Sequence, residues 1–406
     1  MSNIRYNEFG DIMKVAGIIV EYNPLHNGHL HHILETRTLS NCDYLVAVMS
    51  GNFTQRGEPA MIDKFTRTKM ALQNHVDLVI ELPFVFSVQS ADIFASSSVA
   101  ILNHLCVDEI YFGSESGNIK ELEEISEILE SEKYNNLVQA FLKEGFSYPT
   151  SSDMAIKKLI SSDIYDLPNN ILGIQYINAA KKLNSKLKVK TIKRISTGYY
   201  DEFTNDTNIQ SASAIRKMLK SNEDISKYVP KSVEALLANR KIIDLNMFSD
   251  LLKYKIFSSS NDDLEAIFNI TEGFENRIKK VRNFTDIDDL ISQIITKRYT
   301  NSKIKRSLIH ILCGTLKKDL DSLIVPYIRI LGMNQTGQKY LNIIKKDLEV
   351  PLISKISDDK HPYLEMELTS SKIYSMVSDV DVFKEELLPP IVLHFDWFSM
   401  KKDYNL

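Results

Sequence analysis

The chain has 406 residues, of which 44% are hydrophobic, 25% charged and 9% aromatic, a composition that excludes a disordered or fibrous protein. At roughly 100–200 residues per domain, this length predicts two or three domains, each able to bury its own core. The net charge of −4, taken over the whole chain, argues against a nucleic-acid partner, because phosphate binding requires an excess of cations.

The cysteines and the apolar segments indicate the cellular compartment in which the protein is expected. The 3 cysteines are scattered and form no CxxC pair, which disfavours a disulfide framework and suits a reducing environment. Residues 78–88 form the longest apolar stretch, but Glu81 and Pro83 interrupt it and it is too short to span a bilayer. Residues 1–12 lack the apolar region of a secretory signal. We therefore expect a cytoplasmic protein that does not enter a membrane, with residues 1–12 as an N-terminal extension.

The first part of the chain alternates β-rich runs with helical stretches. The predicted strands cover residues 14–21, 44–49, 77–82 and 108–113, and the predicted helices cover residues 28–40, 63–75 and 91–105. Such alternation predicts a parallel sheet covered by helices on both faces. Ligands of these sheets bind beyond the carboxyl ends of the strands, so the loops that follow the strands are where we expect the site.

The rest of the chain is predicted to be mainly helical. Residues 119–165 and 169–183 precede a fifth strand over 188–195, and residues 211–216 open another helix. After a mostly helical stretch to residue 320, proline breaks and shorter runs predict a small mixed module. The predicted organisation is an extension (1–12), an α/β domain (13–222), a helical region (223–320) and a C-terminal module (321–406).

Charge is distributed unevenly along the chain. Residues 101–150 hold 3 basic and 10 acidic residues, whereas residues 151–200 hold 9 basic and 3 acidic ones. The stretch 297–318 contains 7 Lys and Arg residues and no Asp or Glu. A solvated helix face is the ordinary interpretation of such a run. If the chain binds RNA, we expect this acid-free stretch to contact the RNA backbone. The basic residues of 181–194 are expected to take part in the same contact.

The strongest local signal is the segment EYNPLHNGH, residues 21–29, directly after the first predicted strand. His26 and His29 are spaced i, i+3, so both imidazoles point the same way from the first turn of a helix. Gly28 lets a ligand approach the backbone, and the helix N-terminus attracts anions. These features predict that the segment grips the phosphates of a nucleotide and that the imidazoles stabilise the charge of departing pyrophosphate.

Two other interpretations of this segment stay open. Four of the nine histidines lie between residues 26 and 32, which is compatible with a zinc site, although no nearby cysteine or acidic residue completes a ligand set. The second interpretation is a structural loop with incidental histidines. The position at the end of a strand favours the nucleotide site.

Residues 23–29 resemble the HxGH signature of the nucleotidyltransferase superfamily. The segment SASAIR, residues 211–216, is similar to the second signature of that superfamily. Its hydroxyl groups can cap a helix and bind phosphate, and Arg216 can pair with phosphate bidentately. The resemblance implies an α/β fold, with a Rossmann-like nucleotidyltransferase domain built on a parallel sheet and followed by a mostly helical C-terminal region.

The resemblance is closest to one family. The runs GIIVEYNPLHNGH, SGNFTQRGEPAMIDKFTR, DLVIELPFVFSVQSA, PNNILGIQY and IKRISTGYYDE resemble those of the tRNA(Met) cytidine acetate ligases, densely over residues 15–220. This implies a ligase that forms acetyl adenylate from acetate and ATP. It then transfers the acetyl group to N4 of the wobble cytidine of elongator tRNA(Met). The oligomeric state is left open.

The resemblance also implies the site residues, with His26 and His29 as the catalytic pair. It places ATP against Ile19, Val20, Glu21, Tyr22, Asn23, Pro24, Leu25, His26, Asn27, Gly28, His29, Leu30, His31, His32, Gly113, Asn170, Arg194 and Ile195. For the asparagine of the PNN run, Asn170 is preferred and Asn169 stays open. No residue is expected to bind a metal, because Mg²⁺ would bridge phosphate oxygens of ATP. The polar loop 50–59 is expected to contact acetate or cytidine.

Two rival functions remain. One is an adenylyltransferase that acts on a small phosphorylated metabolite, which would need no RNA and would leave the helical half of the chain without a role. The other is a non-catalytic RNA-binding factor on the same fold, against which the intact HNGH segment argues. Because the fold alone does not decide the chemistry, the choice of substrate rests on the family resemblance.

Overall fold

The computed structural model describes residues 10, 12–146, 148–160, 165, 167–183, 186–195, 208–296, 298–320, 323–356 and 361–394. Most of the predicted extension 1–12, the end of the IKRISTGYYDE run and Lys297 lie outside these residues.

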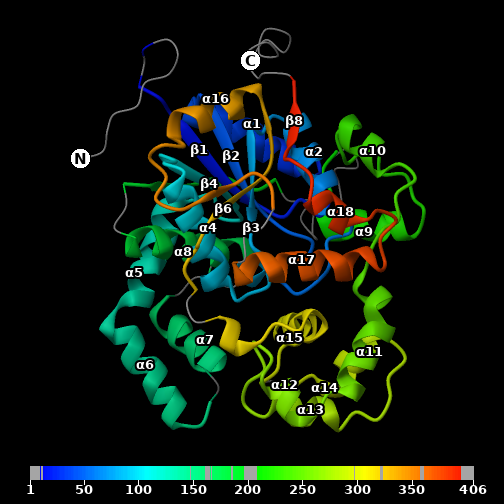
Figure 1. The fold of residues 1–406 in the computed structure, drawn as a ribbon. Helices are drawn as coiled ribbons and strands as arrows, with labels where there is room; N and C mark the ends of the chain where they lie inside the picture. The colour runs from blue at the N-terminus through cyan, green and yellow to red at the C-terminus, as the bar shows by residue number, and fades with distance from the viewer. Residues whose placement is uncertain are drawn as a thin grey trace.

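One sheet organises the molecule (Figure 1). Its strands are β1 (Val15–Val20), β2 (Tyr44–Ser50), β3 (Leu78–Leu82), β4 (Glu109–Ser114), β5 (Lys188–Lys193), β6 (Ile328–Asn334), β7 (Leu352–Ile353) and β8 (Ile391–Leu393). Their order is β5-β4-β1-β2-β3-β6-β7, and β8 also pairs with β6. Strands β1 to β5 all pair parallel with one another, which confirms the predicted parallel sheet. The apolar runs of β2 and β3 are buried along their whole length, as expected of strands covered on both faces.

The helices of the α/β part are α1 (Asn27–Ser40), α2 (Lys64–Gln73), α3 (Phe84–Ser87), α4 (Ala91–His104), α5 (Ile119–Glu130), α6 (Glu132–Lys143), α7 (Tyr148–Leu159), α8 (Pro168–Lys182) and α9 (Ala212–Lys220). The later ones are α10 (Lys231–Leu237), η2 (Leu245–Phe248), α11 (Ser249–Ser258), α12 (Asn261–Glu265), α13 (Phe274–Lys279), α14 (Ile287–Ile294), α15 (Asn301–Cys313), η3 (Lys317–Asp319), α16 (Gln335–Ile344), α17 (Pro362–Ser375) and α18 (Val382–Glu386). None of the helices in the described ranges is long and apolar enough to cross a membrane.

The strand order reverses at β1, and this positions the site. From β1 the chain moves through β2 to β3 on one side, whereas β4 and β5 lie on the other side of β1. Right-handed crossovers in opposite directions place their helices on opposite faces of the sheet, so α1 and α2 cover one face and α4 and α8 the other. A crevice therefore opens beyond the carboxyl ends of β1 and β4, where ligands of such sheets bind.

The C-terminal strands extend this sheet. Residues 321–406 were expected to form a small module, but β6 pairs antiparallel with β3, and β7 and β8 pair with β6. The segment therefore has no separate sheet. Every residue of β6 is buried, so the strand completes the core instead of standing at an exposed edge.

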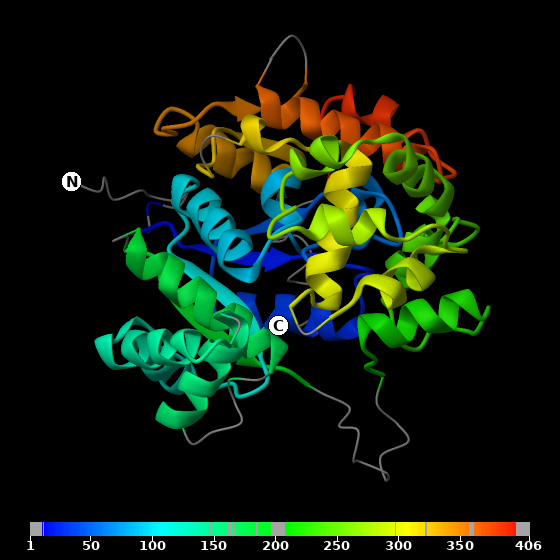
Figure 2. The same ribbon diagram turned by 90° about the horizontal axis from the view of Figure 1, so that it is seen from below.

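The predicted boundaries also do not separate independent cores. Buried apolar residues of 223–320 and of 323–394 belong to the same hydrophobic cluster as those of the sheet. A smaller second cluster lies between α6 and α7. Figures 1 and 2 show α5–α7 and α11–α15 as two groups on opposite sides of the molecule, with α15 beside α17.

Candidate active site

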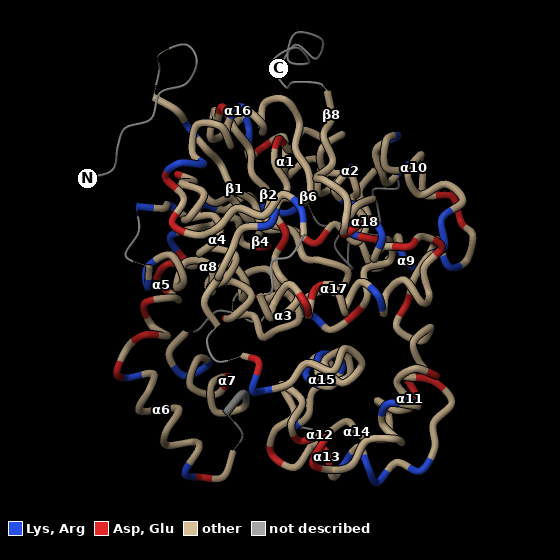
Figure 3. The backbone as a smooth tube through the Cα atoms, in the orientation of Figure 1, with Lys and Arg blue, Asp and Glu red and all other residues tan. Residues whose placement is uncertain are grey.

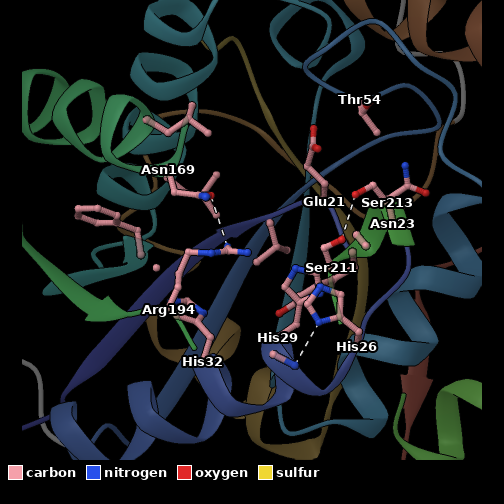
Figure 4. A pocket seen from close by; sticks show the side chains of 18 of the residues that line it. Glu21, Asn23, His26, His29, His32, Thr54, Asn169, Arg194, Ser211 and Ser213 are labelled. Atoms are coloured by element: carbon pink, nitrogen blue, oxygen red, sulfur yellow. Dashed lines mark hydrogen bonds between the residues drawn. The ribbon is translucent and has the colours of Figure 1, made fainter. Parts of the chain in front are cut away.

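A pocket of about 470 Å³ lies at this crevice. Its walls come from the ends of β1 and β4, the first turn of α1, the start of α8, the end of β5 and the start of α9. Figure 4 shows His26, His29 and His32 on one side of it, Arg194 and Asn169 on another, and Ser211 and Ser213 opposite them. The volume is within the range of small-molecule sites.

The first turn of α1 aligns the two histidines of the HNGH segment. His26 is the N-cap of α1, and its Nδ1 accepts a hydrogen bond of 3.1 Å from the backbone N–H of Gly28. The imidazole of His29 stacks on that of His26 with ring centroids 3.8 Å apart, and Tyr22 packs edge-on against His29. The i, i+3 spacing therefore brings both rings to one side of the helix, as predicted.

Burial keeps these imidazoles neutral. It lowers the pKa of His26 to about 4, with a contribution from the charge of Arg194. The pKa of His29 is lowered well below 6.5, mainly by burial and then by His26, and that of His32 is lowered to about 4. Within the described residues, Nδ1 of His29 and Nε2 of His32 are buried without a hydrogen-bond partner. The pocket thus holds neutral rings with ring nitrogens available to an anionic ligand.

The two signature segments meet in the structure. Arg216 Nη1 donates a hydrogen bond of 2.8 Å to the carbonyl oxygen of Asn23, and Asn27 Nδ2 donates to the carbonyl of Asn208 at 2.8 Å. Ser211 caps α9, because its Oγ accepts a bond of 3.2 Å from the N–H of Ala214. The predicted helix cap is confirmed, and the cap places the hydroxyls of α9 in the pocket wall.

Arg194 crosses the pocket beside Gly113. A Cβ atom on Gly113 would lie 3.2 Å from Cγ of Arg194, so a larger residue would displace the guanidinium. Nη1 of Arg194 donates to Oδ1 of Asn169 at 3.4 Å. Asn169 in turn donates through Nδ2 to Glu115. This chain of contacts orients the cationic group that faces the histidines.

The structure brings most of the predicted ATP-site residues together. The following line the pocket: Ile19, Val20, Glu21, Tyr22, Asn23, His26, Gly28, His29, His31, His32, Gly113, Arg194 and Ile195. The others lie outside its wall: Pro24, Leu25, Asn27, Leu30 and Asn170. Leu25 is fully buried in the core, and Asn27 ties the loop to residue 208.

The pocket favours Asn169, the alternative left open, over Asn170, because Asn169 lines it. Asn170 is fully buried, and its Oδ1 accepts bonds from the N–H groups of Glu115 at 3.0 Å and Ser116 at 3.4 Å. Neighbouring residues on a helix point about 100° apart, so only one of the two can face the ligand. Asn170 instead holds the loop after β4 against α8.

Alanine variants are expected to separate these roles. Asn169→Ala releases Arg194, so we expect the Kd for ATP to rise by about 5–10-fold, as for the loss of one net hydrogen bond of about 1 kcal/mol. Asn170→Ala leaves two backbone N–H groups without their acceptor and is expected to lower the free energy of unfolding by about 1–3 kcal/mol. Calorimetric ATP titration and denaturant unfolding of both variants test this. A larger loss of ATP affinity in Asn170→Ala would restore the original preference.

The polar loop 50–59 reaches the same pocket. Thr54, Gln55, Arg56 and Glu58 belong to the pocket wall, and the N–H of Gln55 donates a bond of 2.7 Å to Oε1 of Glu21. The loop therefore faces the nucleotide segment, as expected from its place after β2. Its contact with acetate or cytidine stays a prediction.

Several pocket features were not foreseen. Arg67 is fully buried and donates to the carbonyl oxygens of Glu21 at 2.7 Å and Ser50 at 3.0 Å, joining the ends of β1 and β2. An apolar wall comes from Phe94, Phe112, Leu172, Tyr176 and Ile192. These side chains look like ordinary core residues in the sequence, and no pattern marks them as pocket-lining.

Three of the seven cations of the acid-free stretch 297–318 pair with acids. In the folded chain Arg298 and Lys303 both contact Glu272, at 2.9 and 3.7 Å, and Lys305 contacts Glu58 at 2.5 Å. Figure 3 shows acidic and basic segments interspersed around α11–α14. Acids from distant parts of the sequence therefore offset much of the predicted basic patch. The contact between α15 and the loop 50–59 nevertheless brings this helix to the pocket.

A resident metal is not indicated by the residues present. In the described ranges no group of three or more His, Cys, Asp or Glu side chains could hold a metal ion. The zinc interpretation of the histidine segment therefore loses its structural basis in these residues, because structural zinc requires four protein ligands and catalytic zinc three.

Residues 13–387 match the family model described as HIGH Nucleotidyl Transferase. A Bacillus subtilis protein named tRNA(Met) cytidine acetate ligase is 41% identical over 383 residues, covering 90% of this chain and 92% of that protein. One of the same name from Caldicellulosiruptor saccharolyticus is 41% identical over 379 residues, covering 90% and 94%. The crystal structure of Thermotoga maritima TmcAL bound with alpha-thio ATP superposes with a TM-score of 0.85 at 32% identity, covering 94% of this chain and 100% of that one.

Proposed function

Since the chain belongs to the tRNA(Met) cytidine acetate ligase family of HIGH nucleotidyl transferases, we propose that it is an ATP-dependent acetate ligase acting on tRNA. It forms acetyl adenylate and transfers the acetyl group to N4 of the wobble cytidine of elongator tRNA(Met). The observation that carries the proposal is the stacked pair of His26 and His29 at the N-terminus of α1, inside a pocket of nucleotide size.

ATP is proposed to lie with its phosphates over the first turn of α1. Backbone N–H groups at this helix end and the positive end of its dipole favour phosphate. Arg194 and Ser211 face the same space from the opposite walls. The apolar wall that includes Phe112 and Leu172 offers a surface for the nucleoside.

The first step is an in-line displacement at the α-phosphorus. An acetate oxygen forms a bond to phosphorus, the bond to the bridging oxygen breaks, and pyrophosphate leaves with the electron pair. His26 and His29, neutral before ATP binds, donate N–H hydrogen bonds to phosphate oxygens as negative charge builds up on them. A nearby triphosphate also favours protonated imidazole, so binding raises the pKa of both rings toward the neutral range.

Mg²⁺ is proposed to enter with ATP instead of occupying a protein site. The described residues supply no cluster of three metal-binding side chains, whereas phosphate oxygens are hard ligands that Mg²⁺ prefers. The protein's own contribution is then the orientation of the phosphates by the imidazoles and Arg194.

The tRNA is proposed to approach over the side of the pocket where the loop 50–59 meets α15. Lys193 lines the pocket and is exposed, and Lys217 is exposed on α9, the helix whose first residues line the pocket. These cations are better placed for phosphates than the acid-paired Lys303 and Lys305. Together with these cations, the helical region 223–320 is the proposed tRNA-binding part of the chain, because its α15 reaches the loop 50–59 through the contact of Lys305 with Glu58.

Exchange of labelled pyrophosphate into ATP tests the first step. The proposal predicts exchange that depends on acetate and needs no tRNA. Exchange that depends on a phosphorylated metabolite, or that ignores acetate, would instead indicate the rival adenylyltransferase. Omission of protein and omission of acetate are the two controls.

A further inference from the structure

Glu21 is one of the residues predicted to lie against ATP, and its carboxylate faces the pocket. Glu21 directly follows β1 and is only partly buried, and it lines the cavity. A carboxylate repels phosphate oxygens at short range, so its presence at a nucleotide site needs another explanation. In Figure 4 its side chain points toward the loop that carries Thr54 and away from His26 and His29.

One oxygen of this carboxylate is fixed and the other is available. Oε1 accepts a hydrogen bond of 2.7 Å from the N–H of Gln55 and one of 3.4 Å from Oγ of Ser50. Among the residues that the structure describes, no donor contacts Oε2. The loop 50–59 thus orients the Glu21 carboxylate, and Oε2 stays accessible to a ligand in the cavity.

The surroundings favour a proton acceptor over a cation ligand. Burial raises the pKa of Glu21 above the usual carboxyl value, and the N–H of Gln55 and the charges of Arg67, Arg56 and Arg216 oppose this rise. Burial, and then the charge of Glu21, raises the pKa of the Tyr176 phenol. Three arginines around one carboxylate make a divalent cation unfavourable there, whereas a carboxylate of raised pKa is a better base at neutral pH.

The second half-reaction requires such a base. The exocyclic amine of cytosine is conjugated with its ring and is a poor nucleophile, so its proton must leave as the new bond forms. The loop that orients Glu21 is also the loop that contacts α15, on the side proposed for the tRNA. The carboxylate therefore lies between the nucleotide half of the pocket and the approach of the second substrate.

We propose that Glu21 is the general base that accepts the proton of the cytidine N4 amine during acetyl transfer. This rests on the proposed acetate ligase function. The N4 lone pair attacks the carbonyl carbon of acetyl adenylate, and the bond from that carbon to the phosphate oxygen breaks. AMP leaves with the electron pair, and the N4 proton passes to Oε2 of Glu21.

The test separates the two half-reactions in Glu21→Gln. The amide oxygen can still accept the bond from Gln55, so the variant is expected to keep acetate-dependent pyrophosphate exchange within about threefold of the unsubstituted protein. Transfer of acetyl to tRNA in a single turnover is expected to fall at least 100-fold, within the range for general base catalysis. Glu109→Gln, at the opposite end of β4, is the matched control and is expected to change neither reaction.

The pH profile of the unsubstituted protein gives a second readout that does not depend on folding of a variant. The transfer rate is expected to rise with pH through a single ionisation above pH 4.5 and then level off, because only the carboxylate form accepts the proton. Equal loss of both half-reactions in Glu21→Gln would place Glu21 at ATP and overturn the inference. Unchanged transfer, or a flat profile, would also overturn it. Absence of exchange in the unsubstituted protein would instead refute the proposed function itself.

Discussion

Replacing His29 with alanine is expected to lower acetate-dependent pyrophosphate exchange by about 10²–10³-fold, the usual effect of removing one preorganised donor to a developing anion. His29 contributes a buried ring nitrogen, Nδ1, that has no hydrogen-bond partner in the described part of the chain, and its ring stacks on His26. The substitution removes the donor and also the surface that holds His26 in place. His26→Ala is expected to have a similar effect, because it also removes the cap of α1.

The control variants distinguish chemistry from folding. His104→Ala, at the end of α4 and outside the pocket, should keep full exchange activity. His29→Asn, which retains a side-chain N–H, should recover part of the loss. His29→Ala should remain folded at the assay temperature, and thermal unfolding of the variant checks this. Full exchange activity in His29→Ala would contradict the assigned role.

Replacing Lys64 with methionine is expected to cost about 3–5 kcal/mol of the free energy of unfolding, the usual effect of breaking a buried ion pair. Lys64 is fully buried at the start of α2, and its Nζ contacts Glu81, Glu367 at 2.8 Å and Glu386 at 2.6 Å. Arg329 is the second cation of the cluster and lies 2.8 Å from Glu81. Removal of Lys64 leaves three buried carboxylates facing one arginine.

The loss of unfolding free energy in Lys64→Met is expected to depend on pH. Burial, and then Glu367, raises the pKa of Glu81 to about 7. Without Lys64 the folded-state pKa of Glu81 rises further, so protonation of this carboxylate at low pH relieves the repulsion. The destabilisation measured by denaturant unfolding should therefore be larger at pH 8 than at pH 6. Lys69→Met, an exposed position on the same helix, should change stability by less than about 0.5 kcal/mol.

A second substitution tests whether the loss of stability in Lys64→Met comes from unpaired charge. Adding Glu367→Gln to Lys64→Met removes one of the stranded carboxylates, so part of the stability should return. An equal or greater loss in the double variant would mean that the cluster acts through packing and not through charge.

Sequence analysis predicted the parts of the fold whose signals lie in residues close together along the chain. The buried apolar runs of β1 to β4 and the helices between them are bounded by turn residues, and their alternation alone implies a parallel sheet. The histidine spacing likewise predicts the arrangement seen in the first turn of α1. The SASAIR cap formed as expected, because capping depends only on neighbouring residues.

The parts that could not be predicted depend on distant partners. Lys64 meets Glu367, which is 303 residues away, and nothing near either residue signals the contact. Lys305 meets Glu58 in the same way, which is why a stretch without acids does not remain a basic surface. The pairing of β6 with β3 also has no local signature. Asn169 and Asn170 differ by one helical position, a distinction that only the register of α8 decides.

Incubation of the protein with ATP, labelled acetate and total tRNA tests the central claim most directly. Digestion of the recovered RNA should place the label in N4-acetylcytidine, and fractionation should place it in elongator tRNA(Met) alone, with no label in the absence of ATP. Label on another nucleoside, or RNA that stays unlabelled while the protein exchanges pyrophosphate into ATP, would contradict the account.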